Sequence, residues 1–505
     1  MPFIPVLGAL AVAFYVLFLL FHKYIRLRHI PGPSLAAWTD GWRWYTMNKP
    51  GHGERMVQLH RKYGHVVRIG PNRVSTSDPA AVHITHGTRS VWEKAPSYRP
   101  SSPVSGGKAM PSIVSMTEAQ STAVHKVAGG AFTANALLDY EDRVDQSCIA
   151  MFSALRGRAA GEVDLSWWFA LFAMDVINRI AFSDSLGFLE TGTDVEGLMA
   201  AAKDRFDHWG HWSAVPTLDW LLFKSPLTRM WKKQKSSPLA AAAQTKLSGR
   251  EYDAEKQSFS KQQDLMGKFL EGTLKHPGLV SSNEVIGMVQ STIGAGADTT
   301  AATLAILFLF LDRHPDVVAN MRKELEDAKI PGNTPSPPAW EDVRKLPYLD
   351  AVIKEAMRIF PVAQWGQDRV VPEGGATIAG QNVPVGTVVG IHIDSIQRNA
   401  ELFGSDADDF NPSRWTSATE ERRARMERAM LGFGAGKRIC LGMHIAWLEM
   451  KKLVPMLIMY LDMDLVDHDM NLIEAVKPSG VRYMPPLPAR VSMRTPISQK
   501  QLISN

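Results

Sequence analysis

The sequence predicts a mainly α-helical protein with a minor β component behind a single N-terminal transmembrane helix. Three observations carry this prediction. Apolar residues recur at helical spacing through most of residues 121–358, short alternating runs occur at 64–76 and 371–389, and residues 3–21 contain no charge. At 505 residues, 45% hydrophobic and 21% charged, the chain is long enough for a large core or two fused lobes.

Residues 3–21 predict the membrane span. A helix of this run would be about 28 Å long at about 1.5 Å per residue, which matches the apolar core of a bilayer. A cleaved signal peptide is the alternative, but no basic residue precedes the run and no small-residue cleavage site follows it. The basic segment 22–29 should stay on the cytoplasmic side. We therefore expect residues 1–28 to form an anchor with its flank and residues 29–505 to form one cytosolic catalytic domain.

Two short regions predict the minor β component. Residues 64–76 alternate between apolar and polar types and are broken by Gly70-Pro71, which is typical of a hairpin. Residues 371–389 contain short runs separated by Gly-Gly and Val-Pro-Val-Gly turns. A polar stretch at 248–263 and a proline-rich loop at 330–338 interrupt the helical part.

Composition narrows the possible partners. The two cysteines, Cys148 and Cys440, cannot build a disulfide framework, which favours a reducing compartment. The net charge of +5 is spread along the chain, and no basic stripe with interleaved aromatic residues occurs. We expect no nucleic-acid partner.

Cys440 ends a glycine-rich loop at residues 433–442 and leads into an apolar helix predicted over 441–457. Gly434 and Gly436 allow tight turns and close approach of the backbone to a flat ligand. At the start of the helix the sulfur would face free N–H groups and the positive end of the dipole, which favour the thiolate. Arg438 can pair with a carboxylate. The alternative is a buried structural cysteine beside a glycine-rich turn.

The loop Phe-x-x-Gly-x-Arg-x-Cys-x-Gly resembles the haem-binding signature of the haem-thiolate monooxygenases, the cytochrome P450 family, and the resemblance covers almost the whole chain. It implies the cytochrome P450 fold, with a large helical lobe and a small β-rich lobe. It also implies haem b as cofactor, with the iron bound axially by Cys440 and with Phe433 and Gly436 in the haem-binding loop.

Residues 295–300 form a second motif, Ala-Gly-Ala-Asp-Thr-Thr, inside an apolar helix predicted over 283–311. Glycines weaken a helix and threonine can bond a backbone carbonyl, so a local kink or groove is expected there. The resemblance implies that Thr299 hydrogen-bonds dioxygen and that Asp298 relays protons to it. A buried threonine bonded to its own helix, beside an aspartate paired with an arginine, is the alternative.

Glu355 and Arg358 lie one helical turn apart and share a face. Alone the pair carries little information. Followed by Phe360-Pro361, and with Phe410-Asn-Pro-Ser-Arg-Trp downstream, it is similar to the family's Glu-x-x-Arg helix and its Pro-x-Arg-Trp partner. The resemblance implies a structural role for Glu355, Arg358 and Arg414 behind the cysteine loop.

Haem propionates require cations, and the resemblance points to Arg438 and Arg369. The chain departs from the family pattern upstream of residues 130–132. Family members often have an aromatic residue or His there, followed four residues later by an Arg. Ser121 and His125 occupy these positions. His125 or Lys126 is expected to donate there, more weakly than a bidentate Arg. An exposed helical histidine with no such role is the alternative for His125.

A lipophilic small-molecule substrate is expected because the segments that the family architecture places around it are apolar with few charges. Four tryptophans are candidates for an apolar channel, with membrane contact or plain packing as alternatives. The segments are 97–115, 205–231, 290–297, 362–365 and 479–483, and the tryptophans are Trp209, Trp212, Trp220 and Trp231.

The resemblance implies a monooxygenase that uses dioxygen and NADPH-derived electrons to hydroxylate, epoxidise or oxidatively dealkylate its substrate. The electrons are expected from a separate NADPH-cytochrome P450 reductase, because the chain has no flavin or nicotinamide fingerprint. Lys437, Lys451 and Lys452 are candidates for docking an acidic partner, or for solvated helix surface. The expected location is the endoplasmic reticulum membrane.

Within the family, residues 30–39 with Arg43, and residues 68–72, look most like fungal pisatin-demethylase-like enzymes, which indicates secondary metabolite biosynthesis. Two alternatives stay open. One is a haem-thiolate isomerase or dehydratase that takes no electrons, against which Asp298 and Thr299 argue. The other is a membrane-anchored haem sensor, which would need the cysteine but no proton relay.

Overall fold

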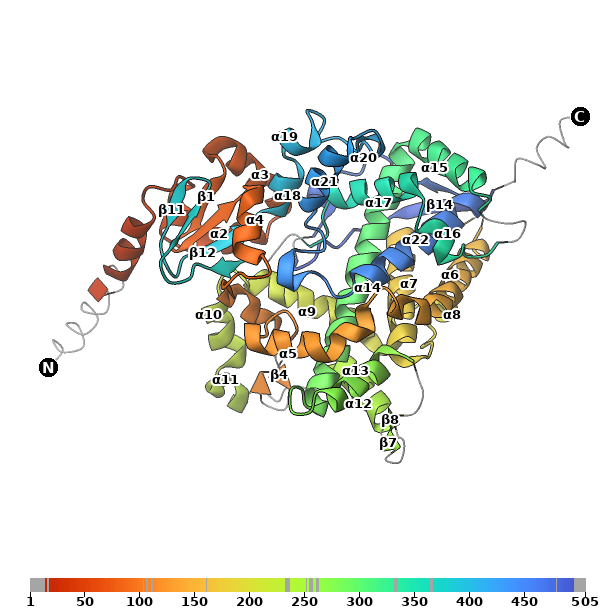
Figure 1. Cartoon of the computed structure of the whole chain (residues 1–505), viewed down its shortest axis with the longest axis horizontal. Coiled ribbons are helices and arrows are strands. Elements are labelled where there is room, and N and C mark those ends of the chain that lie inside the picture. The colour runs from red at the N-terminus through yellow and green to blue at the C-terminus, as the bar shows by residue number, and fades with distance from the viewer. Residues whose placement is uncertain are drawn as a thin grey trace, which may run out of the picture.

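The computed structural model describes residues 14–494 except 16–17, 103, 106–107, 110–111, 160, 232–236, 251, 254–257, 260–262, 331–334, 364–366 and 478. A sheet-rich region at one end of the molecule adjoins a larger helical region, through which α14 runs (Figure 1). This arrangement agrees with the predicted large helical lobe and small β-rich lobe.

The helical lobe is built around α14 (Ser282–Arg313), which packs along α7 (Leu165–Phe182). Ser281 and Glu284 begin α14 with a capping box, in which each side chain accepts a hydrogen bond from the other residue's N–H. The surrounding helices are α5 (Glu118–Ala128), α6 (Glu141–Arg156), α9 (Leu198–Trp212), α12 (Pro238–Ser248), α13 (Leu265–Lys275), α15 (Pro315–Asp327), α17 (Pro347–Ile359) and α22 (Met443–Tyr460).

Two helices of this lobe are long and apolar enough to cross a membrane by composition. They are Leu165–Phe182 and Glu284–Arg313, and 78% of the apolar 18-residue window of each is buried inside the protein. Because both are surrounded by other helices, they form the core of the lobe.

The small lobe contains a five-stranded sheet in the order β1-β2-β12-β9-β3. The predicted hairpin at 64–76 is confirmed as the antiparallel pair β1–β2, with Val66 opposite Thr76. The predicted strands within 371–389 are confirmed as β10, β11 and β12. The strand bounds are β1 (Val66–Gly70), β2 (Arg73–Thr76), β3 (Glu93–Lys94), β9 (Arg369–Val370), β10 (Ala376–Ile378), β11 (Gln381–Val383) and β12 (Val388–Ile391).

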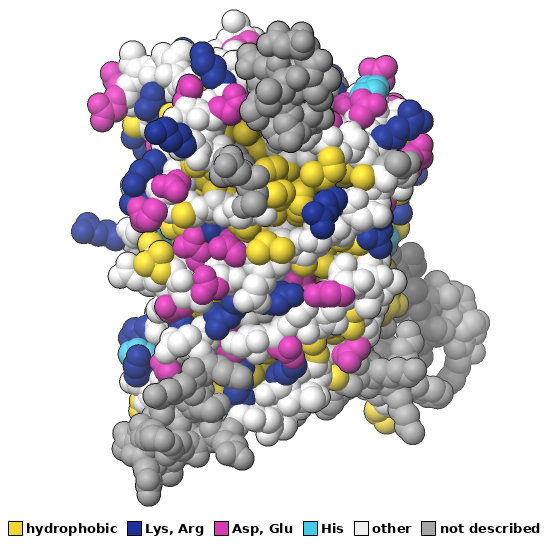
Figure 2. All heavy atoms as spheres, turned by 90° about the vertical axis from the view of Figure 1, so that its right-hand side faces the viewer, with side chains coloured by type: hydrophobic (Ala, Val, Ile, Leu, Met, Phe, Trp, Pro, Cys, Tyr) yellow, Lys and Arg dark blue, Asp and Glu magenta, His cyan; other side chains and the backbone are white. Residues whose placement is uncertain are grey.

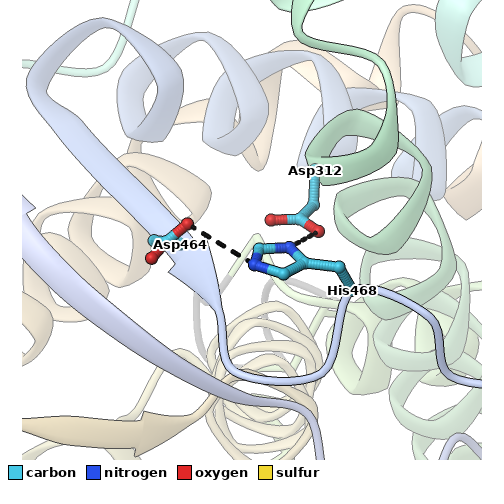
Figure 3. A group of neighbouring side chains, drawn as sticks. All are labelled: Asp312, Asp464 and His468. Carbon is cyan, nitrogen blue, oxygen red and sulfur yellow. Dashed lines mark hydrogen bonds and ion pairs between the residues drawn. The ribbon is translucent and has the colours of Figure 1, made fainter.

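A second sheet, β13-β14-β6, closes the far side of the helical lobe. Its strands are β6 (Glu162–Asp164), β13 (Leu461–Leu465) and β14 (Pro488–Met493). Near the end of α14, Asp312 accepts hydrogen bonds from Leu465 N–H (3.1 Å) and from His468 (2.7 Å), with Asp464 nearby (Figure 3). This group fastens the end of α14 to the second sheet.

The predicted membrane span falls mostly outside the described residues, so it stays a prediction. Of its length, residues 14–15 and 18–21 are described; they are helical, and the helix continues to residue 26. Apolar side chains on this helix are exposed, including Phe14, Phe18 and Phe21. The division between residues 28 and 29 has no test in the structure.

Figure 2 shows one face of the molecule, turned from the view of Figure 1. Lysine and arginine side chains alternate with acidic ones, and apolar side chains show between them. The described part of this face therefore has no large patch of a single charge sign.

Candidate active site

The loop that carries Cys440, the middle of α14 and helix α9 enclose a cavity of about 400 Å³. Its walls are mainly apolar, with cationic side chains at one edge. The lining includes Tyr98, Ile113, Phe132, Ile177, Phe206, Trp209, Ala295, Gly296, Thr299, Val362, Phe433, Cys440 and Ala446.

The cysteine loop is held in place by its own backbone. Cys440 N–H donates to Phe433 O at 2.8 Å, which closes the loop into a tight turn. Gly436 has φ +61°, and a Cβ there would lie 1.7 Å from His86 O on α4 (Pro79–His86). Only glycine fits this position, because the loop packs directly on the end of that helix.

Cys440 is accessible because it lines the cavity. The N–H groups of Gly442 and Met443, just before and at the start of α22, lower the pKa of its thiol, as expected for a helix start. Burial acts in the opposite direction and is the larger effect, so the pKa of Cys440 is raised overall. The N–H groups at the helix start therefore favour the thiolate, as predicted, while burial opposes them.

Thr299 lies on the α14 face that lines the cavity, and its hydroxyl donates to Ala295 O at 2.8 Å. The helix runs unbroken from Ser282 to Arg313, so the expected kink does not interrupt it. Gly296 instead allows close packing, because a Cβ there would lie 3.0 Å from Ile177 on α7. The oxygen of Thr299 keeps lone pairs free to accept a proton donor in the cavity.

Asp298 does not pair with an arginine. Its carboxylate accepts a hydrogen bond from Tyr483 Oη at 2.6 Å, and the ammonium of Lys203 lies 4.2 Å from the centre of the Tyr483 ring. Burial raises the pKa of Asp298 to about 7, although Tyr483 and Lys203 act to lower it. Asp298 can therefore take up and release protons near neutral pH.

Four cationic or imidazole side chains line one edge of the cavity: Lys94, His125, Arg369 and Arg438. Glu118 pairs with Arg438 at 2.5 Å. Arg369 bonds Tyr98 Oη at 3.1 Å, while its buried Nε has no partner among the described residues. Such an edge is built to receive carboxylates.

Sequence reasoning missed Lys94. Its ammonium donates to Ser121 Oγ at 3.1 Å and to Ile113 O at 3.2 Å. Burial, together with Arg438 and Arg369, lowers the pKa of Lys94 to about 8. Ser121 and His125 stand where the family often has an aromatic residue or His and an Arg, so Lys94 restores a cation to this edge from strand β3. Burial also lowers the pKa of His125, which keeps its imidazole neutral at pH 7.

Glu355 and Arg358 are confirmed as a fully buried pair, with both side chains 0% exposed. Glu355 also binds Arg414 Nε at 2.8 Å and Trp415 Nε1 at 2.8 Å. Arg358 donates to the carbonyl oxygens of Gln397 and Ala407. The network ties α17 to the segment 397–415.

The expected substrate segments are brought together except for one. Residues from 97–115, 205–231, 290–297 and 362–363 line the cavity, while Gln364 and Trp365 lie outside the described residues. Segment 479–483 does not line it, and Tyr483 instead binds Asp298. Other residues of this segment bond to α9 and to residue 362: Gly480 N–H donates to Phe206 O at 3.1 Å, and Arg482 N–H donates to Val362 O at 3.0 Å.

Of the four tryptophans, Trp209 lines the cavity and donates to Ser97 O at 3.0 Å. Trp212 packs against Trp44 and Phe223 instead, and Trp220 is 50% exposed. The side chain of Trp231 lies outside the described residues. One of the expected channel residues is therefore placed at the cavity.

The expectation of a docking patch at Lys451 and Lys452 is wrong. Both are buried, Lys451 against Asp350 at 3.0 Å and Lys452 against Glu141 at 2.5 Å and Asp145. Lys437 is partly exposed and pairs with Glu118 at 3.2 Å.

A thiol loop and the Thr299 hydroxyl on the walls of one apolar cavity, together with a cationic edge, define a haem-thiolate oxidoreductase. Asp298 is next to Thr299 on α14 but is not one of the described residues that line the cavity. The family model for Cytochrome P450 matches residues 32–493. A cytochrome P450 monooxygenase of Aspergillus terreus is 37% identical over 90% of this chain and 93% of its own length. Cytochrome P450 monooxygenase pkfB of Emericella nidulans is 34% identical over 88% of each chain.

Cytochrome P450 monooxygenase mpaDE of Penicillium brevicompactum is 33% identical over 91% of this chain, which spans 55% of that longer protein. The chain belongs to the cytochrome P450 family, whose cofactor is haem b with an axial cysteine thiolate. It is an oxidoreductase, and its family implies a redox partner and a small-molecule substrate.

The described residues fit this cofactor. Cys440 Sγ lies on the cavity wall, and the unpartnered Nε of Arg369 and the cations beside it suit two propionates.

Proposed function

We propose that this protein is a membrane-attached monooxygenase that inserts one oxygen atom from dioxygen into a lipophilic small molecule. NADPH-cytochrome P450 reductase supplies the electrons, and the work is part of fungal secondary metabolite biosynthesis. The single observation that carries the proposal is the position of Cys440 and Thr299 on the walls of one apolar cavity. The relatives named above, cytochrome P450 monooxygenases of fungi, support the biosynthetic setting.

The bound haem supplies oxygen activation and electron transfer, and this chain's residues supply the rest. Cys440 Sγ would bind the haem iron, and Arg369, Arg438, Lys94 and His125, which line the same cavity, would hold the propionates. Apolar walls exclude water and orient the substrate.

Asp298 and Thr299 form the proton path. Asp298 exchanges protons near neutral pH because its pKa is about 7. Thr299, the next residue on the helix, presents its hydroxyl to the cavity, where it can pass a proton on. An isomerase or a sensor would make no use of such a path.

Attachment to the endoplasmic reticulum membrane, with the catalytic domain in the cytosol, is part of the proposal. Its support is the uncharged run at 3–21 and the exposed apolar side chains on helix 18–26. A second apolar surface lies near α10 (Pro216–Asp219) and α11 (Pro226–Trp231), at the same end of the molecule in Figure 1. It consists of Trp220, Leu221, Leu222, Leu227 and Met230.

The deciding experiment compares Cys440→Ser with Cys148→Ala in the ferrous carbon monoxide complex. The far-red Soret band of thiolate ligation should appear in the wild type and in Cys148→Ala, whose side chain is buried in the core, and disappear in Cys440→Ser. Persistence of the band in Cys440→Ser would refute the ligand assignment. Reductase-driven NADPH consumption that rises with substrate separates the monooxygenase from an isomerase or a sensor.

A further inference from the structure

One cation on the cavity wall stands apart from the cationic edge. Arg205 on α9 lines the cavity together with Phe206 and Trp209. Among the described residues it has no carboxylate within ion-pair distance, and its one hydrogen bond is a long one, 3.4 Å, to Ser291 Oγ on α14. Lys203, two residues earlier, has Asp207 as its partner at 2.5 Å.

An unpaired guanidinium in an apolar wall is costly, because burial removes water and no negative charge replaces it. Burial lowers the pKa of Arg205 to about 10, and no nearby carboxylate opposes this effect. The side chain still carries its positive charge at pH 7. Ser291 Oγ makes no other hydrogen bond among the described residues, so its proton is free to be donated.

The distance from Arg205 and Ser291 to Thr299 limits the length of the ligand. Ser291 and Thr299 are eight residues apart on α14, which is about 12 Å along the axis at about 1.5 Å per residue. Between them the wall is formed by small residues, Gly294, Ala295 and Gly296, which leave room for an apolar body.

We propose that the substrate is a lipophilic carboxylic acid whose carboxylate binds Arg205 and Ser291, while its apolar body extends along α14 toward Thr299. The oxidised carbon then lies roughly 10–12 Å from the carboxylate, as the helix spacing sets. This inference rests on the proposed function and names the substrate class for the same cavity.

The test measures binding of two probes of nearly equal shape, biphenyl-4-carboxylate and the neutral biphenyl-4-carboxamide. The full-length, haem-loaded protein in nanodiscs of uncharged lipid is titrated by calorimetry and by the Soret shift. The wild type should bind the carboxylate at least about ten-fold more tightly, since a charge-assisted pair is worth that much in affinity.

Three variants locate the effect. Arg205→Gln should bring the two dissociation constants together with little change for the carboxamide, and Ser291→Ala should reduce the preference by a few-fold. Lys246→Gln removes a surface cation paired with Asp184 and should leave the preference intact. The thiolate band reports whether each variant is folded and loaded.

A ratio near one in the wild type would overturn the proposal, and so would a preference that survives in Arg205→Gln. Either result in a protein that keeps its thiolate band and reductase-driven NADPH consumption refutes the acid site alone. Loss of the band or of NADPH consumption in the wild type refutes the proposed function instead.

Discussion

The acid strength of Asp298 is set by side chains from three parts of the chain. Burial on α14 raises its pKa, while the hydroxyl of Tyr483 and the ammonium of Lys203 lower it, with a result of about 7. The pKa of this carboxyl group therefore depends on two residues outside the motif at 295–300.

Tyr483→Phe tests this control. Removing the hydrogen bond takes away a group that favours the carboxylate, so the pKa of Asp298 should rise above about 7. The inflection of the pH profile of product formation should move to higher pH, and the thiolate band should be unchanged. An unshifted profile would mean that Tyr483 only packs against α14.

The same pKa has a consequence for folding. Asp298 has a pKa of about 7 in the folded protein and about 3.8 when unfolded. Its neutral form therefore contributes to the free energy of unfolding below pH 4, and this contribution is lost as the pH rises through 7. Asp298→Asn should remove this part of the pH dependence, as measured by thermal unfolding between pH 4 and pH 8. Its stability should then vary less with pH than that of the wild type.

Thr299→Ala tests the other half of the path. If the hydroxyl passes protons in the cavity, the variant should keep its thiolate band and substrate binding but form less product per NADPH, with peroxide in its place. General acid–base assistance is worth about 10²–10⁴-fold, and a water can fill the vacated site, so we expect roughly ten-fold loss of coupling. An unchanged product-to-NADPH ratio would leave Thr299 a packing role.

At the scale of elements, the buried network of Glu355, Arg358 and Arg414 joins α17 to the segment that precedes the cysteine loop. Glu355 accepts from both guanidinium groups and from Trp415. Removing the carboxylate leaves the buried Arg358 without its carboxylate partner, while Arg414 keeps its two hydrogen bonds to Asp406.

Glu355→Ala should therefore lower the free energy of unfolding by about 3–5 kcal/mol and release haem. Lys354→Ala is the matched control, since Lys354 lies on the same helix but pairs with Asp350 and Glu427 near the surface. It should cost at most about 1 kcal/mol. Denaturant unfolding and haem content per chain measure both effects, and equal losses in the two variants would argue against a special role for the network.

At the scale of the whole molecule, membrane attachment and haem binding should be separable. No site residue lies in residues 1–28, and the family match begins at residue 32. Deleting residues 1–28 should weaken resistance to carbonate extraction while the thiolate band persists. The apolar surface around Trp220 is expected to hold part of the protein on the membrane, so adding Leu222→Ser and Leu227→Ser should release more of it.

In intact microsomes, a protease added outside should digest the catalytic domain of the full-length protein. Protection of that domain would contradict the proposed orientation. Unchanged membrane attachment after the deletion and both substitutions would show that another surface anchors the chain.

Sequence alone determined the features that depend on local patterns. Residue spacing predicts the helical periodicity and the β1–β2 hairpin. Glycines at places where a Cβ cannot fit indicate the Cys440 loop. Glu355 and Arg358 lie one turn apart, so their pairing could be expected, and the downstream motif indicated Arg414.

Only the tertiary structure decided the contacts between distant segments. Tyr483 is 185 residues from Asp298, and Lys94 reaches the cavity edge from a strand. Lys451 and Lys452 resemble surface charges in sequence, yet acidic residues of other elements bury them. In sequence Arg205 resembles any other helical arginine, and only the fold shows that it has no carboxylate partner among the described residues. The burial and the charged partners of such groups depend on which distant segments pack together. The spacing of residues along the sequence does not predict this packing.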